Sequence, residues 1–204
     1  MAQRSDAAIL EMRDVVCRRG GRELFANLTT KLRIGESLRV AGPNGVGKSS
    51  LIRMISGLLP CYQGVIDRTD SIALTDERAA MDRGSSVRNT LNFWAKLDRA
   101  APASLEAAAA HFGLSPLMDV PTRMLSTGQR KRVTLARTMA SGAKLWLLDE
   151  PGNGLDQRAL AALGSAMDAH VAGGGAIVAA SHFDLPHHFT GVITLGQDQQ
   201  SVAA

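Results

Sequence analysis

The apolar positions change their spacing twice along the chain, which divides it into a β-rich beginning, a helical middle and an α/β end. Apolar and polar residues alternate over 9–17 and again in a stretch running through 28–32, with a polar turn at 19–22 between them. This pattern predicts two strands joined by a tight turn. After a turn at 35–36, residues 37–41 predict a buried strand that runs into a glycine-rich loop.

Helical spacing of the apolar positions begins after that loop. Residues 49–59 predict a helix that stops at Pro60. From about residue 80 to 141 the spacing stays helical. The helices expected there cover residues 87–97, residues 104–112, a segment that starts at Ser115 and Pro116, and residues 126–140. We interpret this block as a helical insertion in an α/β core.

Strand patterns return after the helical block. Residues 144–148 form an unbroken apolar run, which is typical of a strand in a parallel sheet covered on both faces. Residues 161–171 predict a helix that ends at three glycines, and 176–180 predict another buried strand. We therefore expect one α/β domain with a mainly parallel central sheet and an N-terminal antiparallel part. Its core covers about 1–79 and 142–204, and its helical subdomain about 80–141.

The composition agrees with a single folded domain. Of the 204 residues, 45% are hydrophobic and 21% are charged, which is ordinary for an α/β protein. The net charge of +4 and the pI of about 9.5 raise the question of a nucleic-acid or membrane-surface partner, but the excess basic residues are scattered along the chain. No nucleic-acid partner is therefore expected.

Neither the cysteines nor the apolar runs indicate a secreted or membrane-spanning chain. Cys17 and Cys61 stand alone, without CxxC or metal-type spacing, and are expected to be reduced in the cytosol. The N-terminus lacks the apolar run of a signal peptide, and nowhere do about 18 apolar residues follow one another. We expect a chain that does not itself cross a membrane.

The glycine-rich loop, GPNGVGKS, matches the phosphate-binding P-loop pattern GxxxxGK[ST] between an expected strand and an expected helix. Its glycines let successive N–H groups converge on phosphate oxygens, and the helix N-terminus adds a partial positive charge. Lys48 is expected to reach the β- and γ-phosphates, and the Ser49 hydroxyl to bind Mg²⁺. A plain glycine-rich turn before an amphipathic helix is the alternative. The candidate nucleotide-binding residues are Gly42, Pro43, Asn44, Gly45, Val46, Gly47, Lys48, Ser49 and Ser50.

A second element, residues 145–150, ends in two carboxylates. Asp149 at the end of the buried strand is expected to hold Mg²⁺, and Glu150 to polarise the attacking water as a general base. A solvated acidic strand end is the alternative. Together with the P-loop, this pair indicates an NTPase or a kinase. The NKxD-type stretch of guanine-specific proteins is absent, while a small-molecule kinase stays open on these two motifs.

A third motif, LSTGQ at 125–129, looks like an anion-binding helix start, yet it lies far along the chain from the P-loop. It resembles the LSGGQ signature of the ATP-binding cassette (ABC) family. The other motifs follow in that family's order, with the acidic strand at 145–150, a D-loop at 153–156 and a switch histidine, His182. The resemblance spans most of the chain, and it implies an ABC-type P-loop NTPase that binds and hydrolyses ATP, with Lys48, Glu150 and His182 as catalytic candidates.

The resemblance also accounts for the separation of the two phosphate sites. It implies that two copies of the chain, or this chain and a second ABC subunit, pack head to tail around two ATP molecules. Ser126, Gly128 and Gln129 would contact the ATP held by the other subunit, Asp156 would lie at the seam, and His182 would contact the γ-phosphate within its own chain. Closure on ATP and release on hydrolysis would make a ligand-driven switch.

Two parts of the family pattern are missing. Arg18 and Arg19 stand where an aromatic residue usually stacks on adenine, and a guanidinium stack, assigned to Arg19, is the expected substitute. The glutamine of the family's Q-loop is absent from residues 73–78. Asp76 or Glu77 is the candidate to take over its contacts.

Two further features concern side chains near the proposed sites. Thr127 stands where the signature usually has a glycine, so a side chain is added beside the γ-phosphate position. His182, His187 and His188 lie close in sequence and could suggest a metal or haem ligand set. We favour the switch role for His182 instead, because residues 184–186 read as a loop.

The resemblance favours transport. Soluble ABC switch proteins of translation or DNA repair generally carry two cassettes or long coiled-coil inserts, and this chain has neither. We expect a transporter ATPase that attaches, at the cytoplasmic face of the inner membrane, to an integral membrane permease on another polypeptide. By analogy, the Q-loop region and residues 87–97 would grip that permease.

A narrower resemblance lies in the short C-terminal part and in three stretches, RGGRELF at 19–25, TLNFW at 90–94 and GNGLD at 152–156. These are similar to the ATP-binding subunits of cytochrome c biogenesis, which are described as haem exporters. The ATPase of another small exporter and a soluble ABC switch protein are the alternatives.

Overall fold

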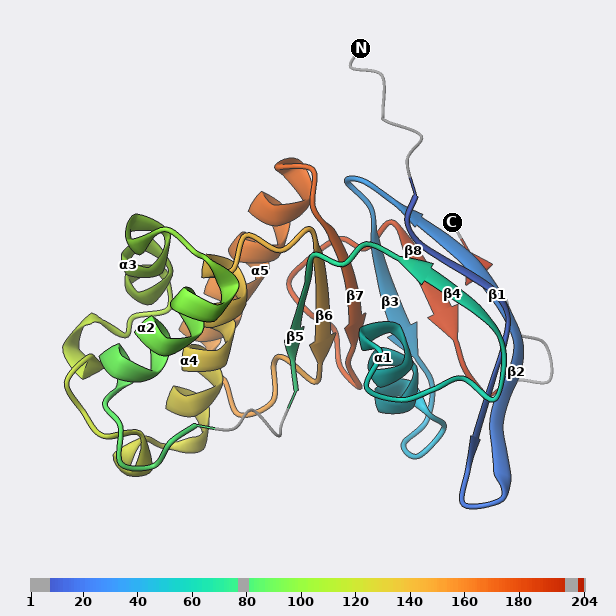
Figure 1. The fold of residues 1–204 in the computed structure, drawn as a ribbon, viewed down its shortest axis with the longest axis horizontal. Helices are drawn as coiled ribbons and strands as arrows, with labels where there is room; N and C mark the ends of the chain where they lie inside the picture. Colours follow the sequence, from blue (N-terminus) through green and yellow to red (C-terminus); the bar gives the residue numbers. More distant parts are fainter. Residues whose placement is uncertain (1–7, 77–80, 197–201, 204) are drawn as a thin grey trace, which may run out of the picture.

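The computed structural model describes residues 8–76, 81–196 and 202–203. A sheet with the strand order β5-β6-β7-β3-β8-β9 runs through its middle (Figure 1). Its strands are parallel, apart from the short β9, which pairs antiparallel with β8. The strands are β3 Ser37–Ala41, β5 Ile72–Thr75, β6 Leu145–Asp149, β7 Ala176–Ala180, β8 Gly191–Thr194 and β9 Val202–Ala203. The predicted parallel sheet is thus confirmed.

A second, antiparallel sheet is built by β1 (Ala8–Arg19), β2 (Arg22–Arg33) and β4 (Gln63–Arg68) in the order β2-β1-β4. Gly20 and Gly21 form the turn between β1 and β2, and their φ angles of 55° and 78° are those that a two-residue hairpin turn of this hand needs. The predicted pair of N-terminal strands is therefore confirmed.

The parallel sheet separates two apolar cores, because its central strands are apolar on both faces. All five residues of β6 and all five of β7 are buried. Along β6, Leu145 and Leu147 belong to the core shared with the antiparallel sheet, whereas Trp146 and Leu148 belong to the core on the opposite face. The unbroken apolar runs in the sequence reflect this double burial.

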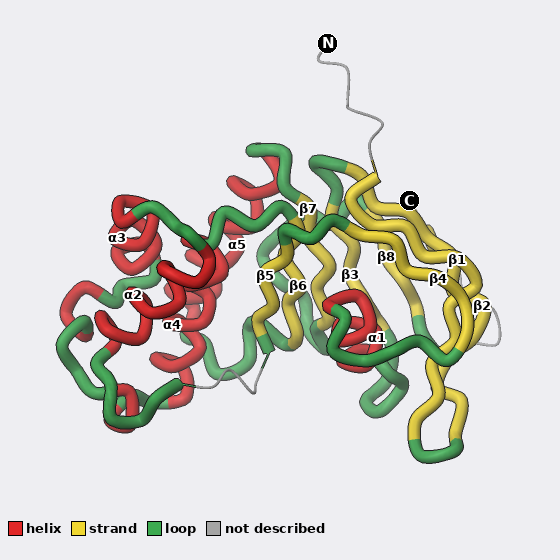
Figure 2. Tube along the Cα trace, in the orientation of Figure 1, coloured by secondary structure: helices red, strands yellow, loops and turns green. Residues whose placement is uncertain are grey.

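Helices cover both faces of the parallel sheet. The first, α1 (Lys48–Ser56), lies between the two sheets, while α2, α3 and α4 gather beyond β5 at one end of the molecule (Figures 1 and 2). Arg137 ties α4 to α2, because its guanidinium lies 3.5 Å from the Trp94 ring centroid and its Nε donates to Asp98 Oδ2 over 3.3 Å. The remaining helices are α2 Val87–Asp98, α3 Pro102–His111, α4 Thr127–Ala140 and α5 Gln157–Ala172, with single 3-10 turns η1 Ser115–Leu117 and η2 Thr122–Met124.

Several predicted boundaries are wrong. The helix expected over 49–59 ends at Ser56, because Gly57 takes a left-handed conformation with φ 82°. The helix expected from Ser115 is a single 3-10 turn. The helix expected from residue 161 begins at Gln157, since Asp156 caps it by accepting a hydrogen bond from the N–H of Ala159, the third residue of the helix.

Candidate functional site

The P-loop connects β3 to α1 and has a backbone that only glycine adopts easily. Gly42 and Gly47 have φ angles of 139° and 117°. A Cβ on Gly42 would lie 2.6 Å from the Leu195 carbonyl oxygen, and one on Gly47 would lie 3.1 Å from the Phe25 ring. The loop therefore bends tightly against its neighbours and delivers the chain to the N-terminus of α1, where unpaired N–H groups favour an anion.

Lys48 places a positive charge inside this loop. Its side chain is buried, and Nζ donates to the carbonyl oxygens of Gly42 and Pro43 over 2.7 and 3.1 Å. The ammonium is thus held at the start of the loop, beside the helix N-terminus. A cation and a set of N–H groups converge here, and that donor set fits the phosphates of a nucleotide.

Ser49 and Asp149 meet although they are far apart in sequence. Ser49 Oγ donates to Asp149 Oδ1 over 3.0 Å, which joins α1 to the end of β6. Burial raises the pKa of the Asp149 carboxyl, and the hydrogen bond from Ser49 opposes that rise. A hydroxyl and a buried carboxylate are oxygen ligands of the kind that Mg²⁺ takes together with substrate phosphates and water, so the donor set fits this ion.

Glu150 and His182 form a second contact at the same end of the sheet. His182 Nδ1 lies 2.8 Å from Glu150 Oε2, and the His182 N–H donates to the same oxygen over 3.4 Å. Glu150 has a φ of 47°, a left-handed conformation that is unusual for a residue other than glycine. Such strain is concentrated at functional sites, where it aims a side chain. The carboxylate is therefore aimed out of the strand and onto the histidine.

The start of α4 is the second candidate phosphate site. Ser126 Oγ accepts from the Gln129 N–H over 3.2 Å, and Gln129 Oε1 accepts from the Ser126 N–H over 2.8 Å, so the two residues form a capping box. The first turn of α4 contains no acidic residue. Its N-terminal charge is therefore not neutralised within the turn, which favours an anion from elsewhere.

Gly128 brings this helix start against the D-loop. A Cβ on Gly128 would lie 2.4 Å from the carbonyl oxygen of Gly154, so only glycine fits. The signature and the D-loop thus form one packed unit.

The D-loop is also tied to the acidic end of β6 and to α5. The Asn153 N–H donates to the Glu150 carbonyl oxygen over 3.3 Å. Asp156, at the other end of the loop, is the N-cap of α5 and accepts from the Ala159 N–H over 2.7 Å. Its expected place at a subunit seam stays a prediction.

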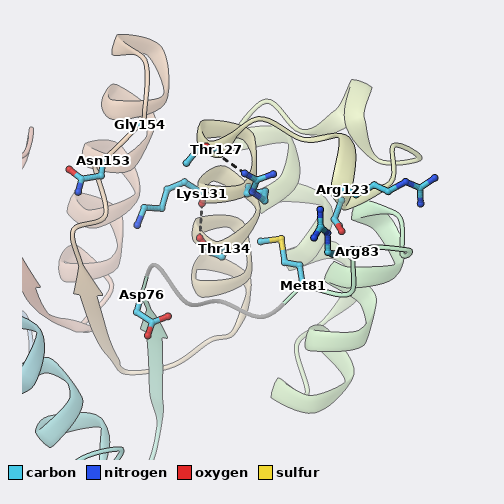
Figure 3. Close-up of a pocket in the computed structure, with 11 residues that line it drawn as sticks. Asp76, Met81, Arg83, Arg123, Thr127, Lys131, Thr134, Asn153 and Gly154 are labelled. Atoms are coloured by element: carbon cyan, nitrogen blue, oxygen red, sulfur yellow. Dashed lines mark hydrogen bonds between the residues drawn. The ribbon is translucent and has the colours of Figure 1, made fainter.

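A cavity of about 710 Å³ extends from the signature toward Asp76. Figure 3 shows Thr127, Lys131 and Thr134 along one face of α4, with Asp76 and the D-loop across the cavity from them. The other lining residues are Met81, Arg83, Thr122, Arg123, Arg130, Asn153 and Gly154. The cavity is rich in basic residues and reaches the segment where the Q-loop is expected.

Of the two residues expected to replace the Q-loop glutamine, the structure describes only Asp76. Asp76 Oδ2 lies 3.8 Å from an Arg53 guanidinium nitrogen, an ion pair that sequence patterns did not predict. Glu77, the other candidate, lies outside the described residues. The replacement of the glutamine therefore stays a prediction.

The two arginines expected to stack on adenine lie in different surroundings. The Arg18 guanidinium lies 4.7 Å from the ring centroid of Tyr62, so its face is already used within the chain. Arg19 is exposed at the end of β1. The contact of Tyr62 with Arg18 was not predicted from the sequence, because a single aromatic residue before a strand does not form part of a recognisable motif.

Comparison with known proteins agrees with this geometry. The family model described as ABC transporter matches residues 25–153. The cytochrome c biogenesis ATP-binding export protein CcmA of Novosphingobium aromaticivorans is 52% identical over 169 residues, which cover 83% of this chain and 86% of the relative. The protein of the same name from Sphingopyxis alaskensis is 48% identical over 177 residues, covering 87% and 91%.

Solved structures show the same fold. A structure titled ATP binding subunit of ABC transporter superposes with a TM-score of 0.83 at 22% identity, covering 92% of this chain and 85% of the other. CbiO1 of Clostridium perfringens, part of the ABC transporter complex cbiONQ, superposes with a TM-score of 0.76 at 24% identity, covering 96% and 88%.

The fold and the site define an ABC ATPase. Its marks are the P-loop, the acidic end of β6 and the signature at the start of α4. Within that class, the chain belongs to the family of cytochrome c biogenesis ATP-binding export proteins.

Proposed function

We propose that two copies of this chain, or this chain and a second ABC subunit, pack head to tail and enclose two ATP molecules. The observation that carries the proposal is the position of α4, which lies on the far side of β5 from the P-loop helix α1 (Figure 1). The start of α4 favours an anion, yet it lies in a different part of the chain from the P-loop. Ser126, Gly128 and Gln129 would therefore serve a nucleotide bound to the other subunit.

Within one subunit, the proposed roles follow from the contacts. The P-loop N–H groups and Lys48 bind the phosphates, and Ser49 and Asp149 would hold Mg²⁺, which would neutralise charge on the β- and γ-phosphates. Glu150 accepts a proton from the attacking water, and His182 orients that carboxylate and contacts the γ-phosphate. Hydrolysis removes the contacts that hold the two subunits together.

The division of labour between the parts of the chain is also a proposal. Residues of about 1–79 and 142–204 would form the nucleotide-binding core, and those of about 80–141 a helical subdomain that presents the signature. The helices of the second part share one apolar core with β6, β7 and α5. A closure of one subunit on another would thus be transmitted through packed side chains.

As a member of its family, the chain is the ATP-hydrolysing subunit of an ABC transporter in cytochrome c biogenesis. Haem is the cargo that we propose for the export step. Among the described residues, none of the helices combines the length and the apolar character that a membrane span needs. We propose that the chain attaches to an integral membrane permease subunit at the cytoplasmic face of the inner membrane, and that no nucleic acid takes part.

Affinity purification of the tagged full chain from detergent-solubilised membranes tests this assignment. A multi-span membrane protein is expected among the co-purifying proteins. Recovery of ribosomes or DNA-repair proteins, without any membrane protein, would instead support a soluble ABC switch.

Leu97→Asp is expected to reduce recovery of the membrane subunit roughly tenfold. Phe93 and Leu97 lie one helical turn apart on α2 and are 58% and 60% exposed, so they present an apolar surface to a partner. Leu58→Asp is the matched control, because Leu58 is 68% exposed on a different part of the molecule. Equal losses for both variants would show that the contact does not depend on α2.

Asp149→Asn is expected to raise the melting temperature at pH 8 by roughly 2–4 °C and to abolish Mg²⁺-dependent hydrolysis. The folded chain raises the pKa of this carboxyl, so its ionised form is destabilising above that pKa. Below both the folded and unfolded pKa values the group is protonated in each state, and the gain from asparagine should disappear. Thermal unfolding between about pH 3 and 8 measures the difference, because the lower limit lies below the ordinary pKa of an aspartate. A gain that does not depend on pH would contradict this cause.

A further inference from the structure

His187 is a buried side chain that joins three elements of the fold. Its side chain is 3% exposed. Its Nδ1 lies 2.5 Å from Asp168 Oδ1 on α5, and its Nε2 lies 3.0 Å from Ser37 Oγ at the start of β3. Neither contact was predicted from the sequence, in which His187 was only part of a possible metal-ligand set.

The order of these groups resembles a Ser-His-Asp hydrolytic triad, but the serine is in the wrong place for one. Ser37 is fully buried, at 0% exposure, and its Oγ also accepts from the Thr190 N–H over 3.3 Å. A nucleophile must reach its substrate, and this one is enclosed by the core. The contacts therefore hold parts of the chain together.

A neutral imidazole satisfies every group in this network. With the proton on Nδ1, the ring donates to Asp168, and Nε2 accepts the hydroxyl proton of Ser37. Ser37 Oγ keeps a lone pair for the Thr190 N–H. A network in which every member has a partner holds its elements rigidly.

The element held by His187 is the loop that carries His182. Another polar anchor of this loop, Asp184 with Arg39, lies at the surface, since the Asp184 side chain is 90% exposed. Ion pairs between exposed side chains contribute little to the stability of the fold. The His187 ring and its Ser37 partner are buried, while its Asp168 partner is exposed. The ring lies five residues from the histidine that contacts Glu150.

The two elements that His187 contacts both lead to the proposed ATP site. Ser37 begins β3, which runs directly into the P-loop, and Asp168 belongs to α5, which begins directly after its N-cap, the D-loop residue Asp156. The loop of His182 is thus tied to the start of β3 and to α5, the two elements that lead to the P-loop and from the D-loop.

We propose that His187 is a positioning residue: through Ser37 and Asp168 it holds the loop in the place where His182 lies on Glu150. This inference rests on the proposed function, because it assigns His187 a role in the hydrolysis step. His187 itself acts through the loop, and the groups that would touch the nucleotide are others.

The first test measures the position of His182 without relying on activity. In the full chain, His187→Ala is expected to change the imidazole NMR signals of His182, because its contact with Glu150 is loosened. His188→Ala is the matched control, since His188 is the exposed neighbour in the same loop, and it should leave those signals unchanged. Unchanged His182 signals in His187→Ala would overturn the proposal.

The second test separates positioning from folding. His187→Ala is expected to lower kcat for ATP roughly tenfold, with the KM for ATP changed less than about twofold. Asp168→Ala is expected to lower kcat as well, but by a smaller factor. The Asp168 side chain is 64% exposed, so its removal should not unfold the chain. A lower melting temperature with an unchanged kcat would show that the network is only structural.

The third test asks whether His187 acts through His182. In a chain that already carries His182→Ala, adding His187→Ala is expected to cost no further activity. A further tenfold loss would overturn the proposal. Failure of the proposed function is a different result, in which the unmodified chain neither binds nor hydrolyses ATP.

Discussion

Glu150→Gln is expected to slow ATP hydrolysis about 10²–10³-fold and to leave ATP binding intact. Glutamine has the size of glutamate and keeps an oxygen for the contact with His182, but it cannot take a proton from water. Because hydrolysis is what separates the subunits in our proposal, the variant should accumulate as a dimer in Mg²⁺ and ATP.

Light scattering at increasing ATP concentration measures this accumulation. The same variant in ADP is the control, since ADP lacks the γ-phosphate that both subunits would contact. A variant that stayed monomeric at every ATP concentration would count against pairing between copies of this chain.

Ser126→Asp is expected to abolish ATP-driven dimerisation while the single chain still binds ATP. Aspartate caps a helix as well as serine does, so α4 keeps its first turn. Its negative charge would face the γ-phosphate of the other subunit and repel it. The expected result is a loss of dimer without a loss of fold.

Ser126→Asn is the matched control for this charge. Asparagine is an equally good N-cap and is neutral, so its effect on dimerisation should be much smaller. Both variants are compared by light scattering in the Glu150→Gln background, with nucleotide binding measured on each. Equal losses for the two variants would place the effect in the cap and not in the phosphate contact.

Much of the fold could be predicted because its signals are local. The alternation over residues 9–17, the glycine-rich loop and the apolar run at 144–148 each specify an element through neighbouring residues, and each is present. The P-loop could be recognised for the same reason, since its glycines and Lys48 are contiguous.

The missed elements lack such signals. β4 is mostly exposed at the edge of the antiparallel sheet, so it shows no apolar alternation. Its formation depends on pairing with β1, a contact between segments about fifty residues apart. The early start of α5 depends on a single cap, Asp156, and an aspartate alone does not distinguish a helix cap from a residue at a subunit seam.

Long-range contacts could not be predicted either. Ser49 and Asp149 were both expected at a metal site, but Arg53 with Asp76, and His187 with its two partners, join residues that share no motif. The nucleotide contacts of the predicted site residues stay predictions.

The most direct test mixes two variants, each of which is expected to hydrolyse ATP slowly when alone. In a head-to-tail dimer of one Glu150→Gln chain and one Ser126→Asp chain, one ATP site has a substitution on both sides, and the other combines an unmodified Glu150 with an unmodified Ser126. Mixing the chains before ATP is added should therefore restore hydrolysis well above the sum of the two separate rates. A mixture that hydrolyses no more than that sum, at any ratio, would contradict the shared site.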